Sequence, residues 1–118
     1  MPRYVLLLHE TPADYAAMTA AQMKDLVARY AAWSREMREK GVLKDGHKLT
    51  DDGGRRLTRS GKGVVATDGP YSEAKEVIGG LFVIEAADDA EAEALTRGCP
   101  HLHSGEHNWV ELRRIDEM

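Results

Sequence analysis

Two short stretches of this chain, Tyr4–Leu8 and Leu81–Ile84, are apolar at every position. Short apolar runs of this length, bounded by polar or turn residues, are typical of strands that are buried on both faces. A strand of an antiparallel sheet with one face in water would instead alternate apolar and polar residues. We therefore expect a sheet whose two central strands need cover on both sides.

Two helices are predicted between the strands. Thr19 and Gln22 have the spacing of a capping box, and apolar residues recur behind them at helical intervals. Gly41 is suited to end this long helix near residue 40. Asp88 is suited to cap a second, Ala-rich helix that ends near Arg97, and further acidic residues follow in its first turn, where the helix dipole favours them.

The remaining segments predict further strands. Residues 42–49 and 109–113 have strand character, and a hairpin arm is predicted from strands 55–59 and 63–67, joined at Ser60-Gly-Lys62. The element order is then β-α-β, arm, β-α-β. This order predicts an α+β, ferredoxin-like fold, in which one antiparallel sheet carries two helices on one face, in a single domain of 118 residues.

The two helices of such a fold cover only one face of the sheet. The simplest cover for the other face is a second copy of the same sheet, which predicts a two-fold homodimer. The alternative is that the arm folds back over the open face of its own chain.

Composition and charge limit the partners. The net charge of −4 argues against a nucleic-acid partner, and the apolar run near the N-terminus is too short for a signal peptide or a membrane span. The only cysteine, Cys99, cannot form an internal disulfide, and this fits a reducing cytoplasm. No phosphate-binding motif surrounds Gly79-Gly80, and no cofactor is predicted.

The stretch TDGPYSEAKEVIGG at residues 67–80 resembles the signature of the DGPF branch of the YCII-related family. Segments 41–49 and 99–113 are similar to other parts of that family. The fourth signature position is Tyr71, where the family has Phe. The resemblance implies a dimeric α/β barrel, in which two ferredoxin-like protomers pack sheet to sheet.

The same resemblance leaves two functions open. Some relatives resemble isomerases, dehydrochlorinases and monooxygenases of aromatic or polyketide-like compounds, which implies cofactor-independent acid/base chemistry on a small organic molecule. Others are associated with alternative sigma factors, which implies a non-catalytic ligand-sensing or interaction module for transcription regulation. The resemblance also implies a His–Asp pair for acid/base work, with the His early in the first long helix and the Asp before a proline near the end of the second. This chain lacks both residues, because its first long helix has no histidine and Cys99 precedes Pro100.

Other residues are therefore candidates for the site. His9 ends the first predicted strand and Asp68 ends the arm, so convergent strand ends would make them an acid/base couple. His47 is placed to join them, Tyr71 to line a substrate cleft, and Glu76 to position or polarise a substrate. The alternatives are that Asp68 caps a turn, that His9 is an exposed edge residue, and that Glu76 belongs to a solvated turn or an interface.

Three histidines near the C-terminus, His101, His103 and His107, lie close in sequence to Cys99. His103 and His107 have a spacing found in zinc sites, but the paired cysteines of a structural zinc site are missing. A polar loop is the favoured interpretation, and no metal is predicted.

Overall fold

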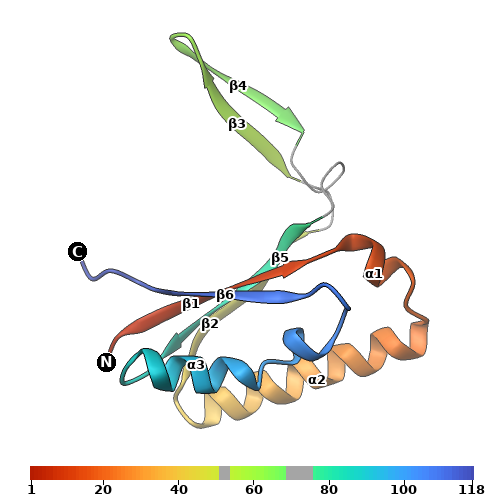
Figure 1. Ribbon diagram of the computed structural model, residues 1–118, viewed down its shortest axis with the longest axis vertical. Coiled ribbons are helices and arrows are strands. Elements are labelled where there is room, and N and C mark those ends of the chain that lie inside the picture. The colour runs from red at the N-terminus through yellow and green to blue at the C-terminus, as the bar shows by residue number, and fades with distance from the viewer. Residues whose placement is uncertain (51–53, 69–75) are drawn as a thin grey trace.

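The computed structural model describes residues 1–50, 54–68 and 76–118 and has an α+β fold (Figure 1). Four strands form one antiparallel sheet in the order β2-β5-β1-β6. They are β1 (Arg3–Glu10), β2 (Leu43–Lys48), β5 (Val77–Glu85) and β6 (Trp109–Arg114). Two helices, α2 (Ala20–Glu39) and α3 (Asp89–Arg97), pack against one face of this sheet. The predicted ferredoxin-like arrangement is confirmed.

A second, two-stranded sheet forms the predicted arm from β3 (Arg55–Ser60) and β4 (Gly63–Asp68). One helix was not predicted, the short α1 (Pro12–Ala16), because a single turn carries too few residues to show a helical repeat. A 3₁₀ turn, Pro100–His103, follows α3. Within the described ranges, no helix combines the length and the apolar character needed to cross a membrane.

The predicted helix caps are present. The Thr19 hydroxyl accepts from the backbone N–H of Gln22, and the Gln22 side chain accepts from the backbone N–H of Thr19, which completes the capping box of α2. Asp88 accepts from the backbone N–H of Glu91 at 2.8 Å and caps α3. These contacts satisfy backbone donors that have no partner inside the helix.

The core lies between the helices and one face of the sheet. Tyr4, Leu6 and Leu8 of β1 are buried there, against Trp33 and Met37 of α2. Because successive residues of a strand point to opposite faces, Val5, Leu7 and His9 point away from the helices. We call this side the open face.

The register of the strands identifies the neighbours of these residues on the open face. Val5 is paired with Val83, and Leu7 with Leu81 on one side and Glu111 on the other. The apolar members are only partly buried in the single chain, although they lie on the two central strands. The sheet thus has the uncovered apolar centre that the sequence predicts.

The Gly79-Gly80 pair lies within β5 and brings other atoms close to its backbone. The strand register shifts at this point, because Leu8 pairs with Gly80 and His9 with Ile78. A Cβ atom at Gly80 would lie 2.8 Å from the backbone oxygen of His47 on β2. A Cβ atom at Gly79 would overlap the side chain of Glu10. The glycines therefore permit close approach between neighbouring strands.

The substitution Gly80→Ala is expected to lower the free energy of unfolding by about 1–3 kcal/mol, because the clash is with backbone and the strands must separate to relieve it. Chemical denaturation measures this change. Gly63→Ala is the matched control, since its Cβ would meet its nearest atom at an ordinary 3.8 Å, and a change within about 0.5 kcal/mol is expected. Equal effects for the two variants would show that strand spacing does not require Gly80.

Candidate functional site

His9 lies on the open face at the end of β1, where its ring is largely covered. The imidazole stacks on the indole of Trp109, the residue paired with it on β6, with ring centroids 3.9 Å apart and planes 9° from parallel. Only 13% of the His9 side chain is exposed. Stacking and burial therefore fix the ring orientation, so that its two nitrogens have defined neighbours.

Each ring nitrogen of His9 faces a carboxylate. Nε2 is 3.1 Å from Oε1 of Glu111 on β6, and Nδ1 is 3.2 Å from Oε1 of Glu76, just before β5. A neutral imidazole has one N–H, whereas this arrangement is best satisfied when both nitrogens carry hydrogens. The three side chains thus form a cluster that can hold and exchange protons on the open face.

A buried histidine holds the backbone of His9 from the opposite side of the sheet. Nε2 of His101, in the 3₁₀ turn, donates to the carbonyl oxygen of His9 at 2.7 Å. Its Nδ1 accepts from the hydroxyl of Tyr30 on α2 at 2.6 Å. Burial lowers the pKa of His101, and this favours the neutral ring that the two hydrogen bonds require. His101 is a positioning residue for His9.

The hydrogen bonds continue from His101 toward α1. The side-chain amide of Asn108 donates to the carbonyl of His101 at 3.2 Å and to the Tyr15 hydroxyl at 2.7 Å. Burial raises the pKa of both Tyr15 and Tyr30, so their hydroxyls remain protonated donors. We call Tyr15, Tyr30, His101 and Asn108 the buried network.

The structure brings together only some of the residues selected from the sequence. His9 and Glu76 are in contact, but Asp68 is not part of the His9 cluster. Asp68 forms an ion pair of 3.3 Å with Arg55 across the base of the arm, and 84% of its side chain is exposed. The structure therefore does not form the expected His9–Asp68 couple.

The two remaining substrate-binding candidates have different outcomes. His47 shares the open face through its pairing with Leu81, but β5 separates it from β1. Its Nε2 contacts Asp45 at 2.9 Å, and 61% of its side chain is exposed. Tyr71 lies outside the described residues, so its predicted role in lining a cleft stays a prediction.

The histidines considered for a metal site have separate partners. Nε2 of His103 donates to the carbonyl of Arg97, and the His107 ring contacts Asp14 at 3.1 Å. His101 belongs to the buried network, and burial raises the pKa of the Cys99 thiol to about 11. In the part of the chain that the structure describes, no three metal-binding side chains come together.

Sequence reasoning missed Glu111, Trp109 and the buried network. Glu111 and Trp109 alternate with apolar residues on the last strand. This pattern indicates that the two residues share one face of the sheet, but it does not show which residues of β1 lie beside them. Tyr30 lies on the α2 stripe that includes Leu26 and Trp33, a helical spacing that is typical of core packing. Only the sheet register and the fold of the 3₁₀ turn bring these residues to His9.

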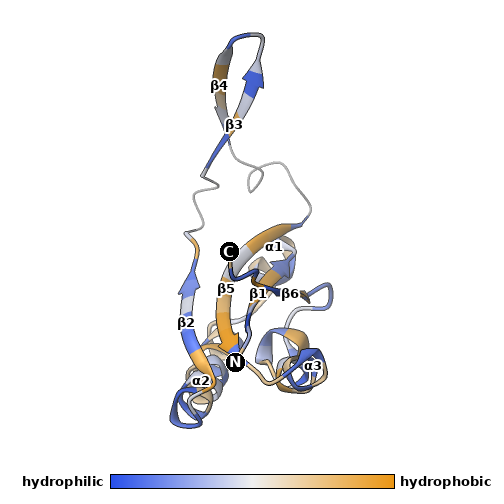
Figure 2. Ribbon diagram, turned by 90° about the vertical axis from the view of Figure 1, so that its left-hand side faces the viewer, coloured by the Kyte–Doolittle hydropathy of each residue, from blue (hydrophilic) through white to orange (hydrophobic). Residues whose placement is uncertain are grey.

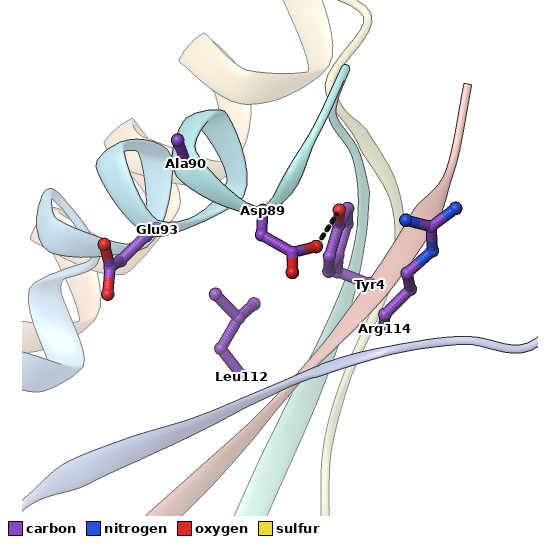
Figure 3. Close-up of a pocket in the computed structure, with 6 residues that line it drawn as sticks. All are labelled: Tyr4, Asp89, Ala90, Glu93, Leu112 and Arg114. Carbon is purple, nitrogen blue, oxygen red and sulfur yellow. Dashed lines mark hydrogen bonds between the residues drawn. The ribbon is translucent and has the colours of Figure 1, made fainter.

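A separate pocket of about 380 Å³ lies between α3 and β6, near the start of β1 (Figure 3). The Tyr4 hydroxyl donates to Oδ1 of Asp89 at 2.6 Å, and Figure 3 shows these side chains pointing toward one another. The other lining residues are Ala90, Glu93, Leu112 and Arg114. His9 is at the far end of β1, so this pocket and the His9 cluster are different places.

Comparison with known proteins gives one family and no curated relative. A search of the curated proteins finds no match to this chain. The profile of the YCII-related domain matches residues 2–116, nearly the whole chain. Together with the ferredoxin-like sheet, this match establishes that the chain belongs to the YCII-related family.

Proposed function

We propose that the protein is a homodimer that performs acid/base chemistry on a small organic molecule, with His9 as the proton carrier. The single observation that carries this proposal is the position of the His9 ring. It stacks on Trp109 and lies about 3 Å from carboxylates on both sides, on a face of the sheet that is otherwise apolar at its centre. We also infer, from the signature at residues 67–80, that the chain belongs to the DGPF branch.

The proposed chemistry is proton transfer to and from carbon or oxygen of a bound molecule. An imidazole can act as acid and as base near neutral pH, and a carboxylate beside it stabilises the imidazolium that forms when it takes a proton. Glu111 orients the ring through Nε2, while Glu76, at the edge of the described structure, is the more exposed of the two carboxylates. Glu76 is therefore the partner that a substrate group displaces, and Nδ1 is the nitrogen that exchanges the proton.

The proposed dimer completes the surroundings of this cluster. A second copy packed on the open face would cover Val5, Leu7, Leu81 and Val83 and exclude water from the space near His9. Excluding water strengthens the interaction between an imidazolium and its carboxylates. The same packing would hold an organic molecule between two apolar sheets.

A test of the cluster uses the ring nitrogen signals of His9. We expect Glu111→Leu to shift the ¹⁵N signal of Nε2 by more than that of Nδ1, because Glu111 contacts Nε2 at 3.1 Å. Glu106→Leu, a change in an exposed loop, is the control and is expected to move neither signal. If Glu111→Leu moves the two signals no more than Glu106→Leu does, the proposed proton-holding cluster is contradicted.

A ligand screen tests the function itself. Small aromatic acids and ketones that bind at the cluster are expected to raise the melting temperature of the wild type and to lose at least tenfold in affinity with His9→Gln. Asp89→Asn, in the pocket between α3 and β6, is the control. If the compounds that bind lose affinity with Asp89→Asn and not with His9→Gln, the ligand site is the pocket and the proposal is wrong.

The alternative is a non-catalytic interaction module linked to sigma-factor-dependent transcription. The exposed arm is the observation that favours it, because a projecting ribbon is suited to contact another macromolecule. The ligand screen distinguishes the two functions, because an interaction module needs no small molecule whose binding depends on His9.

A further inference from the structure

The arm projects from the body of its own chain, and all twelve residues of its two strands are exposed (Figures 1 and 2). The body is the four-stranded sheet with its helices. A two-stranded ribbon in water is marginally stable by itself, and it normally needs a further surface, such as a third strand or a helix, packed against it. In the described residues the body of the same chain does not supply that surface, because the arm points away from it (Figure 1).

The register of β3 and β4 divides the arm into two different faces. Leu57 is paired with Ala66, and Arg59 with Val64, so these four side chains share one face. Leu57 is 66% exposed and Val64 is 69% exposed. The opposite face pairs Thr58 with Val65 and is more polar. We call the first side the apolar face of the arm, and it is the side that gains most from being covered.

The charge of the arm favours a partner with acidic surface. Residues 55–68 contain four basic residues, Arg55, Arg56, Arg59 and Lys62, and one acidic residue, Asp68, which gives a formal charge of +3. Since the whole chain has a net charge of −4, the rest of the chain carries −7. The arm and the body of this protein are thus complementary in charge, and a second copy presents the matching body.

We propose that the arm of one protomer packs its apolar face on the body of a second copy. This inference rests on the proposed homodimer and adds a second contact to it, in which each protomer holds its partner with an arm. Burial of Leu57 and Val64 supplies the apolar part of the contact, and the basic residues meet acidic side chains of the partner body. The contact would be stronger at low salt, because exposed charges are screened as salt rises.

The test compares two neighbouring valines on opposite faces of the arm. Val64→Ser and Leu57→Ser are each expected to raise the dimer dissociation constant at least tenfold, because each removes apolar contact twice in a symmetric dimer. Val65→Ser is the matched control, with an expected change below threefold, because Val65 lies on the other face. Sedimentation equilibrium over a range of concentrations and at two salt concentrations gives the constants.

The possible outcomes distinguish this inference from the dimer itself. If the wild type is a dimer and Val64→Ser has no more effect than Val65→Ser, the arm contact is wrong and the dimer stands. If the wild type is a monomer at every concentration, both proposals fail. If Val64→Ser lowers the free energy of unfolding without changing association, the arm packs on its own body, which also overturns the inference.

Discussion

The Leu7→Glu variant is expected to be a folded monomer. Leu7 lies at the centre of the open face, between Leu81 and Glu111 in the strand register. In the proposed dimer a carboxylate at this position would be buried between two apolar sheets, and an unpaired buried charge costs several kcal/mol. A symmetric dimer carries the substitution twice, so the dissociation constant should rise by at least a hundredfold.

The fold should tolerate this change, because Leu7 points away from the core formed by Tyr4, Leu6 and Leu8. Sedimentation velocity is expected to give a species of 13.1 kDa, while circular dichroism stays like that of the wild type. Val27→Glu is the control, since Val27 is exposed on α2 and lies away from the open face. If the Leu7→Glu variant dimerises as well as the wild type does, the open face is excluded as the interface.

The sequence predicts this fold well because its signals are local. Continuous apolar runs, a capping box and an acidic helix start each lie within a few residues, and each identifies one element. Their order then leaves few antiparallel arrangements, and the observed order β2-β5-β1-β6 is the ferredoxin-like one. The bounds were less predictable, since β1 and β5 extend beyond their apolar runs at 4–8 and 81–84.

The candidate site was only partly predictable because its contacts span the chain. His9 meets Glu111 across 102 positions, and His101 meets the His9 carbonyl across 92. No local pattern contains such pairs, which depend on strand register. Asp68 shows the opposite case, in which a local pattern predicted a contact that the structure does not form. Its place at the end of a strand predicted that its side chain lies beside His9. That strand belongs to the arm, so Asp68 pairs with Arg55 instead.

The buried network makes a prediction about stability and pH through His101. Burial lowers the pKa of His101 in the folded protein below its ordinary value of 6.5, and a charged His9 ring nearby lowers it further. The unfolded chain therefore binds a proton at a pH where folded His101 does not. The contribution of His101 to stability is fully present above about pH 6.5 and is lost as the pH falls below that value.

The comparison of wild type with His101→Gln isolates this effect from all other titrating groups. At pH 7.5 the variant is expected to be less stable by about 1–3 kcal/mol, because Tyr30 or the His9 carbonyl loses its buried partner. Below pH 6.5 the wild type should lose up to about 1.4 kcal/mol per pH unit relative to the variant, so the difference narrows. Urea denaturation at several pH values measures both quantities.

His103→Gln is the matched control, because His103 lies in the same 3₁₀ turn but is exposed. Its stability should follow the wild type at every pH. A difference between wild type and His101→Gln that stays constant from pH 7.5 to pH 5.5 would show that His101 keeps its ordinary proton affinity in the folded state. Burial would then not favour the neutral ring over the charged one, and the Tyr30 hydroxyl would lose its acceptor at Nδ1 whenever His101 takes a proton, because a protonated Nδ1 cannot accept. The Nε2 donor to the His9 carbonyl would remain, so His101 would still hold the backbone of His9 but would not make the stability of the fold depend on pH.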